Sequence, residues 1–140
     1  ETVQLSTLLA GRKVVIFGLP GAYTGTCTTA HVPSFIRTKS AFAEKGVDEV
    51  ICLSVNDPFV MEQWGKDTGA TEAGLTMLGD SMSAFTLAIG LDFDAPPVGF
   101  KARSKRYAMY VEDGVVITLN AEASPGECEI SAGETLLASL

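Results

Sequence analysis

A strand pattern at residues 49–55 constrains the fold of this chain more than any other feature, because its sequence Glu-Val-Ile-Cys-Leu-Ser-Val is apolar on both faces. Strands of this kind lie inside parallel sheets, where helices cover both faces. Residues 13–18 form a second buried-strand pattern that ends at Pro20-Gly21, and residues 28–44 have the spacing of a helix. The order strand, helix, strand predicts an α/β layer fold with a parallel core.

The rest of the chain continues this alternation. Asp57 and Pro58 are suited to cap and start a helix, and Ser131 with Glu134 has the spacing of a capping box. The remaining predictions are a strand at residues 75–78, a helix at 81–89 capped by Ser81, a loop at 92–104, a hairpin of strands 106–111 and 115–120 around Asp113-Gly114, a loop at 121–129 and a helix at 131–140. This order fits a thioredoxin-like fold, in which helices flank a central mixed sheet.

Length and charge limit the kind of protein. The chain has 140 residues, 46% of them apolar, which predicts a single domain over residues 1–140 and argues against intrinsic disorder. Its 10 basic and 17 acidic side chains give a net charge of −7, so nucleic-acid phosphates and anionic membrane surfaces repel it. No apolar run approaches the roughly 18 residues of a membrane span. We expect neither a nucleic-acid partner nor a membrane partner.

The three cysteines are Cys27, Cys52 and Cys128. Their spacing gives no C-x-x-C motif, and an odd number of cysteines is not typical of a disulfide framework. A Cys/His zinc site is not expected with one histidine, and the loop between Gly18 and Gly25 lacks the G-K-[ST] of a phosphate-binding loop. We expect no metal and no cofactor, so each thiol either fills the core or takes part in chemistry.

Cys27 has the position of a reactive residue. It follows the strand at 13–18 and a Gly/Pro-rich loop, and it lies where the helix at 28–44 begins. Active sites of open α/β sheets lie beyond the carboxyl ends of the strands. Unpaired backbone N–H groups and the positive end of the helix dipole favour the nucleophilic thiolate there. The alternative is a small buried thiol that fills a gap between helix and sheet.

The residues around Cys27 are similar to those of a known family. The pattern Pro20-x-x-x-Thr24-x-x-Cys27 resembles the active-site signature of the peroxiredoxins. The string Pro-Gly-Ala-Tyr-Thr-Gly-Thr-Cys-Thr-Thr-Ala-His-Val-Pro-Ser-Phe resembles their type II, or peroxiredoxin-5-like, branch, as do residues 52–60 and 106–114. The resemblance runs from about residue 5 to residue 140 and implies a thioredoxin-like peroxiredoxin domain.

The resemblance implies a thiol-dependent peroxidase that serves antioxidant defence and cell redox homeostasis. Cys27 would be the peroxidatic cysteine, whose thiolate attacks a hydroperoxide and becomes sulfenic acid. The Thr24 hydroxyl would orient the peroxide, while Pro20 would shield the thiolate and keep the loop rigid. The implied substrates are hydrogen peroxide, alkyl hydroperoxides and, as a further candidate, peroxynitrite. Thioredoxin, glutaredoxin or glutathione would reduce the enzyme again.

A basic cluster stands out in this acidic chain, because Lys101, Arg103, Lys105 and Arg106 supply four of its ten basic groups. The simplest interpretation is a solvated, charged loop. The family pattern instead selects Arg106, directly before a strand. A guanidinium stays charged and donates several hydrogen bonds in a fixed geometry, so Arg106 would favour the Cys27 thiolate and hold the peroxide.

Two cysteines are candidates for the resolving thiol that attacks the sulfenic acid. Cys128 stands in a polar loop, at a position that resembles the resolving cysteine of animal-type members, whereas plant-type relatives match only Cys27 and Cys52. Cys52 lies in the middle of a strand, where it can equally be a core thiol. We favour Cys128, because a loop thiol can reach Cys27 after modest motion whereas a central strand thiol needs larger unfolding. Glu127 and Glu129 are expected to raise the pKa of Cys128, which slows a resolving thiol without excluding it. One-cysteine turnover, in which glutathione or glutaredoxin attacks the sulfenic acid, stays open.

Further expectations concern His31, assembly and location. His31 is interpreted as a hydrogen-bonded packing residue rather than as the base of a papain-like Cys–His pair. The resemblance implies a homodimer built with loops around the active site. Relatives carry an N-terminal β-hairpin, which we expect to be missing or trimmed here because the chain begins at Glu1. The expected location is the cytoplasm, or a mitochondrion or plastid after removal of a presequence.

A different class of protein could share this fold. The alternative function is a catalytically silent thioredoxin-like interaction module, which needs no reactive thiol. The combination of Pro20, Thr24, Cys27 and Arg106 argues against it, because a binding module has no use for all four together. A general disulfide oxidoreductase is disfavoured by the lack of a C-x-x-C motif.

Overall fold

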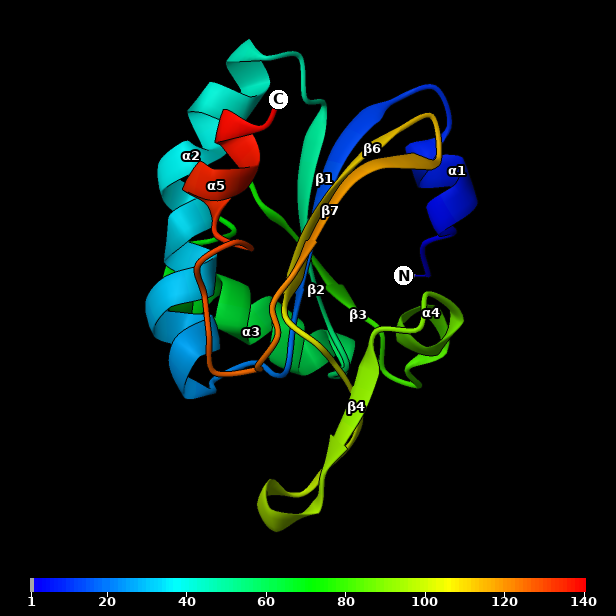
Figure 1. Ribbon diagram of the computed structural model, residues 1–140, viewed down its shortest axis with the longest axis vertical. Helices are drawn as coiled ribbons and strands as arrows, with labels where there is room; N and C mark the ends of the chain where they lie inside the picture. The colour runs from blue at the N-terminus through cyan, green and yellow to red at the C-terminus, as the bar shows by residue number, and fades with distance from the viewer. Residues whose placement is uncertain (1) are drawn as a thin grey trace.

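A five-stranded mixed sheet forms the centre of the computed structural model, which describes residues 2–140 (Figure 1). Its strands are β1 (Lys13–Leu19), β2 (Glu49–Ser54), β3 (Thr76–Gly79), β6 (Tyr107–Glu112) and β7 (Val115–Ala121). The order is β3-β2-β1-β6-β7, in which β1 pairs in parallel with β2 and β2 with β3, while β6 is antiparallel to β1 and β7. The predicted mixed sheet of a thioredoxin-like fold is confirmed.

Helices cover both faces of the sheet. α2 (Val32–Glu44), α3 (Pro58–Thr68) and α5 (Gly133–Ala138) lie on one face, and α1 (Leu5–Leu9) and α4 (Ala84–Ala88) lie on the other (Figure 1). Each face therefore has its own apolar cluster. The cluster under α2, α3 and α5 includes Phe17, Phe35, Trp64 and Leu136, and the one toward α1 and α4 includes Ile16, Ile51 and Tyr107.

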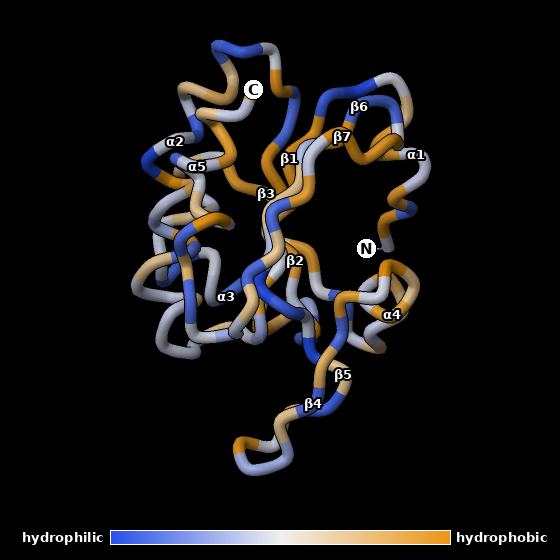
Figure 2. The backbone as a smooth tube through the Cα atoms, in the orientation of Figure 1, coloured by the Kyte–Doolittle hydropathy of each residue, from blue (hydrophilic) through white to orange (hydrophobic). Residues whose placement is uncertain are grey.

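β2 has a parallel neighbour on each side, as its doubly apolar pattern predicted. Within it, Cys52 lies opposite Phe17 of β1 and Met77 of β3. Residues 14–19 and 50–54 are buried, and Figure 2 shows apolar residues concentrated on these central strands. Burial of apolar surface at about 25 cal/mol per Å² is the main favourable contribution to such a core.

Two local signals act as the sequence predicted. The Asp57 carboxylate accepts a hydrogen bond from the Val60 N–H at 2.8 Å, and Pro58 is the first residue of α3. The hairpin of β6 and β7 turns at Asp113 and Gly114, whose φ angles are 47° and 77°. Asp-Gly is suited to this turn because both central residues need positive φ.

The prediction of a loop at residues 92–104 is wrong. The structure forms a hairpin there, with β4 (Asp92–Ala95) and β5 (Phe100–Ser104) joined by a 3₁₀ turn, η2 (Pro96–Val98). The proline and glycine residues are confined to the tip, so the flanking residues pair as strands, for example Phe93 with Arg103. This hairpin projects from the body of the molecule (Figure 1).

The helix predicted at residues 28–44 is confirmed, except in its first turn. Residues Cys27–His31 form a π-helical turn, η1, in which the Val32 N–H donates to the Cys27 carbonyl. α2 then begins at Val32 with Pro33 in its first turn, where a missing N–H donor costs nothing. Single π-helical turns are rare and occur frequently at functional sites.

The predicted capping box at the start of the last helix is not formed. The Ser131 hydroxyl donates to Glu122 instead, and the Glu134 carboxylate pairs with Arg37 on α2. Both side chains are therefore used for tertiary contacts, and α5 begins at Gly133 rather than at residue 131. The local signal was overridden by one partner nine residues away, Glu122, and by one 97 residues away, Arg37.

The other face differs from the predictions in detail. The prediction of Ser81 as the cap is wrong, because the N-cap residue of α4 is Ser83, whose side chain makes no capping hydrogen bond. The Asp80 carboxylate instead accepts hydrogen bonds from the Phe85 and Thr86 N–H groups at 3.2 and 2.8 Å. The helix predicted at 81–89 is shortened accordingly, and α1 lies in a segment for which no helix was predicted. No helix between residues 2 and 140 is both long and apolar enough to cross a membrane.

Candidate active site

Cys27 lies where the loop after β1 enters η1, beyond the carboxyl end of a central strand. Its side chain is completely buried. The next residue, Thr28, donates its N–H to the Thr24 carbonyl at 3.1 Å, and its hydroxyl accepts a hydrogen bond from the Trp64 indole of α3 at 3.2 Å. The first turn that carries the thiol is thus fixed both to its own loop and to the neighbouring helix.

Arg106 lies directly before β6, the antiparallel neighbour of β1, and its side chain contacts Cys27. Its Nη2 atom donates to Cys27 Sγ at 3.2 Å, and only 2% of the arginine is exposed. None of the ion pairs formed among residues 2–140 includes Arg106. A buried charge is costly unless hydrogen bonds or opposite charges compensate it, and the hydrogen bond to Cys27 Sγ is one of the contacts that compensate this guanidinium.

Three further hydrogen bonds fix the direction of the guanidinium. Nε and Nη2 of Arg106 donate to the Pro125 carbonyl at 3.2 and 2.9 Å, and Nη1 lies 3.1 Å from His31 Nδ1. Because arginine can only donate, Nδ1 is the accepting nitrogen of His31, and Nε2–H donates to the Ser131 carbonyl at 3.0 Å. His31 is therefore an anchor for Arg106, which its sequence pattern alone did not reveal.

His31 is neutral under ordinary conditions. Burial, reinforced by the positive charge of Arg106, lowers its pKa to about 3, although the Ser131 carbonyl acts in the opposite direction. The expectation of a hydrogen-bonded packing residue agrees with this geometry. A papain-like pair does not, because both ring nitrogens are occupied by Arg106 and Ser131 and neither is free to take a proton from Cys27.

We expect the free energy of unfolding to fall as the pH is lowered from 7 to 5. Below its ordinary pKa of 6.5, His31 of the unfolded chain binds a proton that the native protein excludes, so acid favours the unfolded state. With a native pKa of about 3, the loss at pH 5 amounts to about 2 kcal/mol. Urea unfolding at the two pH values measures it.

The control for this prediction is His31→Gln. His31 is the sole histidine, so no other imidazole titrates in this range. The glutamine variant should be less stable at pH 7 but should show a smaller change between pH 7 and 5. Equal pH slopes in the two proteins would show that His31 is not the group responsible.

Thr24 and Pro20 line the loop that leads to Cys27. The Thr24 hydroxyl donates to the Gly21 carbonyl at 2.7 Å, which leaves its lone pairs available to accept from a bound peroxide. Pro20 is buried, and its carbonyl accepts a hydrogen bond from Arg103 at 3.0 Å. Arg103 thus holds the loop backbone and not the thiol, whereas Lys101 and Lys105 are exposed.

A residue that sequence reasoning missed also supports this loop. The Asn56 side-chain oxygen accepts hydrogen bonds from the Ala22 N–H at 3.0 Å and from the Ser54 hydroxyl at 2.6 Å. It therefore joins the end of β2 to the loop between β1 and η1. The sequence around Asn56 predicted only the start of a helix. Its contact with Ala22 spans 34 residues, so no local pattern indicates it.

The other two thiols differ in their surroundings, and all three cysteines are free. Cys52 is completely buried in β2, and burial raises its pKa well above the ordinary value. Cys128 is half-buried, and its pKa is raised as expected. The cause differs from the prediction: burial is the largest contribution and Glu122 adds to it, rather than Glu127 and Glu129.

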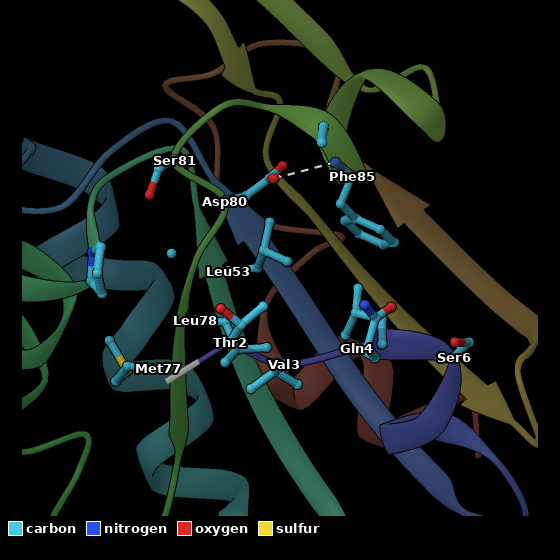
Figure 3. A pocket seen from close by; sticks show the side chains of 14 residues that line it. Thr2, Val3, Gln4, Ser6, Leu53, Met77, Leu78, Asp80, Ser81 and Phe85 are labelled. Atoms are coloured by element: carbon cyan, nitrogen blue, oxygen red, sulfur yellow. Dashed lines mark hydrogen bonds between the residues drawn. The ribbon is translucent and has the colours of Figure 1, made fainter.

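A cavity of about 680 Å³ lies elsewhere, on the face of the sheet that carries α1 and α4 (Figure 3). Val3, Leu53, Leu78 and Phe85 line it together with Asp80, whose carboxylate is already bonded to α4 (Figure 3). No cysteine, histidine or arginine is among its described lining residues. The cavity is therefore separate from the buried cluster around Cys27.

Known proteins are similar to this chain in sequence and in fold. The Redoxin family model matches residues 1–137. The chain is 44% identical to Peroxiredoxin-2F, mitochondrial, of Arabidopsis thaliana over 137 residues, which cover 98% of this chain and 68% of that protein. Reduced Prx3 from Vibrio vulnificus in complex with hydrogen peroxide is 45% identical, with a TM-score of 0.91 over 97% of this chain and 86% of that one. Peroxiredoxin 5 from Alvinella pompejana is 30% identical, with a TM-score of 0.85 over 96% and 82%.

The family match extends over nearly the whole chain, and the relatives are similar in both sequence and fold. Members of this family reduce peroxides with a cysteine thiol, a chemistry that requires an activated sulfur. A completely buried thiol that accepts a hydrogen bond from a buried arginine is consistent with that requirement. The chain belongs to the peroxiredoxins, which are thiol-dependent peroxidases with a thioredoxin-like fold.

Proposed function

We propose that residues 1–140 act as one peroxiredoxin domain, in which Cys27 is the peroxidatic cysteine and Pro20, Thr24 and Arg106 complete the site. The observation that carries this assignment is the hydrogen bond from Arg106 Nη2 to Cys27 Sγ at 3.2 Å. The substrates are hydrogen peroxide and alkyl hydroperoxides, with peroxynitrite as a further candidate. The complex of the Vibrio vulnificus relative with hydrogen peroxide supports the first of these.

In the oxidising step, the Cys27 thiolate attacks the terminal oxygen of the hydroperoxide. A sulfur–oxygen bond forms while the oxygen–oxygen bond breaks, and the leaving oxygen takes up a proton to depart as water or an alcohol. Arg106 donates to the charge that develops across the breaking bond, and the Thr24 oxygen accepts from the peroxide O–H and sets the line of attack. Cys27 is left as a sulfenic acid.

In the resolving step, we favour attack by Cys128 on the Cys27 sulfenic sulfur. The segment around Cys128 is partly exposed, whereas Cys52 lies inside the central sheet and would require the core to open. Cys52 is the alternative resolving residue. A third route is direct reduction of the sulfenic acid by glutathione or glutaredoxin.

Several finer properties rest on the family. We propose thioredoxin or glutaredoxin with glutathione as the reductant, and a homodimer with loops around the active site. The function would be antioxidant defence and cell redox homeostasis. The relatives include a mitochondrial and a chloroplastic Arabidopsis thaliana protein, which supports an organelle as an alternative to the cytoplasm. The chain spans 59% of the length of the chloroplastic relative.

A single turnover tests this function. The reduced protein is mixed with one equivalent of hydrogen peroxide and then alkylated, and its remaining thiols are counted by mass spectrometry. We expect two of the three thiols to be lost and a Cys27–Cys128 disulfide to form within one chain. A Cys27–Cys52 disulfide, or only a glutathione adduct after glutathione is added, would change the resolving assignment. No loss of thiols would favour the catalytically silent module.

A further inference from the structure

Glu122 is the only carboxylate that is almost wholly buried within residues 2–140, with 7% of it exposed. It follows β7, and its N–H donates to the Arg106 carbonyl at 2.9 Å. Its Oε2 atom accepts three hydrogen bonds, from the N–H groups of Glu129 and Ser131 at 2.8 Å each and from the Ser131 hydroxyl at 2.7 Å. Hydrogen bonds to a carboxylate are strong, so Glu122 ties residues 122–131 into a closed loop.

This loop, here named the Cys128 segment (residues 122–131), is also fastened to the active site by its backbone. Arg106 donates twice to the Pro125 carbonyl, at 3.2 and 2.9 Å, and the Thr26 hydroxyl donates to the Gly126 carbonyl at 3.2 Å. Both carbonyls lie within three residues of Cys128. The arginine that contacts the peroxidatic sulfur is therefore one of the groups that hold this segment in place.

Ser131, at the far end of the Cys128 segment, also connects this segment to the active site. Ser131 donates both its N–H and its hydroxyl to Glu122, and its carbonyl accepts the Nε2–H of His31 at 3.0 Å. His31 in turn accepts from Arg106. The Glu122 carboxylate thus holds Ser131, whose carbonyl orients the His31 ring. The ring in turn accepts one of the hydrogen bonds that orient the Arg106 guanidinium.

We propose that Glu122 is a positioning residue whose carboxylate holds the Cys128 segment closed against Arg106. The closed segment supports oxidation of Cys27 and delays the resolving step. This inference rests on the proposed function, in which Cys27 is oxidised and Cys128 resolves. In that step the Cys128 thiolate attacks the Cys27 sulfur, the sulfur–sulfur bond forms, the sulfur–oxygen bond breaks, and the leaving hydroxide takes up a proton to become water.

In the closed segment, Cys27 and Cys128 are not bonded to each other. Cys27 is completely buried, Cys128 is half-buried, and both thiols are free. The segment must leave its anchors before the sulfurs can meet. Removal of the Glu122 carboxylate therefore has opposite effects on the two steps: oxidation slows because Arg106 and His31 lose fixed carbonyls, and disulfide formation accelerates because the open segment becomes more populated.

The test compares three variants with the wild-type chain. Glu122→Ala removes the anchor, Glu122→Gln keeps an oxygen that can accept the same donors, and Glu127→Ala removes an exposed carboxylate of the same segment. Each reduced protein is mixed with one equivalent of hydrogen peroxide. Fluorescence of Trp64, which is hydrogen-bonded beside Cys27 through Thr28, follows oxidation, and quenched alkylation with mass spectrometry follows the disulfide.

For Glu122→Ala, we expect oxidation to slow about tenfold and disulfide formation to accelerate at least about threefold. Glu122→Gln should recover most of the wild-type behaviour, and Glu127→Ala should change neither rate by more than about twofold. A merely structural role would not move the two rates in opposite directions. Unchanged or slower disulfide formation in Glu122→Ala overturns the proposal, whereas a wild-type chain that loses no thiol overturns the proposed function instead.

A second measurement needs no variant and covers the case in which Glu122→Ala fails to fold. Hydrogen exchange of the Glu129 and Ser131 amides is measured in the reduced wild-type protein and in its Cys27–Cys128 disulfide form. We expect slow exchange in the reduced protein and at least about tenfold faster exchange in the disulfide form, because the anchor is broken there. Equal exchange of these two amides in both forms contradicts the proposal.

Discussion

Replacement of Cys27 by serine is expected to lower the rate of hydrogen peroxide consumption by at least roughly 10⁴-fold. The thiolate is an intrinsically strong nucleophile, whereas a serine hydroxyl stays protonated near neutral pH. No neighbouring base can activate the serine, because both nitrogens of His31 are already bonded to other groups. The measurement is the loss of peroxide with excess dithiothreitol as the reductant.

Cys52→Ala is the matched control for this prediction. Cys52 is also a completely buried cysteine of the same apolar cluster, so its replacement removes a core thiol without touching the proposed oxidising step. We expect its first oxidation to proceed within about threefold of the wild-type rate, at a stability cost of about 1 kcal/mol. If Cys27→Ser keeps more than a small fraction of the wild-type rate while Cys52→Ala loses it, the assignment of the peroxidatic residue is wrong.

Replacement of Arg106 by methionine is expected to slow oxidation by a peroxide by about 10²- to 10³-fold, or about 3–4 kcal/mol of transition-state stabilisation. Methionine fills a similar volume but provides no charge and no donor to Cys27 Sγ. Trp64 fluorescence after mixing with hydrogen peroxide measures the rate.

Arg106→Lys distinguishes charge from geometry. An ammonium can keep the positive charge near Cys27, but it cannot reproduce the planar set of donors that reaches Pro125 and His31 as well. We therefore expect a rate well below that of the wild type and above that of the methionine variant. Arg37→Met, which removes an arginine whose side chain is 60% exposed, should leave the rate unchanged. An Arg106→Met protein that oxidises at nearly the wild-type rate would remove Arg106 from the site.

The sequence predicted much of this candidate site. The doubly apolar pattern at residues 49–55 predicted a central parallel strand, and the end of the preceding strand predicted where a reactive group would lie. Arg106 was selected among four neighbouring basic residues only through the resemblance to the peroxiredoxins. Its contact with Cys27 spans 79 residues, and no periodicity or local propensity reports on such a distance.

The features that the sequence did not predict have a common physical cause. Ser131 and Glu134 have the spacing of a capping box, but Glu122 and Arg37 compete for their side chains more effectively. His31 and Asn56 act through hydrogen bonds to residues that only tertiary structure brings near. The hairpin at residues 92–104 was predicted as a loop, because its turn-forming residues are a stronger sequence signal than its two short strands. Local signals predict elements well, while the competition among partners is decided in three dimensions.

The π-helical turn η1 determines where Cys27 lies around the helix axis. On an α-helix each residue advances about 100° around the axis. The additional residue of η1 therefore sets the angular phase of Cys27 relative to everything that α2 packs against. Loss of one residue from this turn would leave α2 and its buried face intact but would rotate the sulfur away from the guanidinium by more than a quarter of a circle. The chemistry proposed for Cys27 thus depends on the one residue that this turn adds.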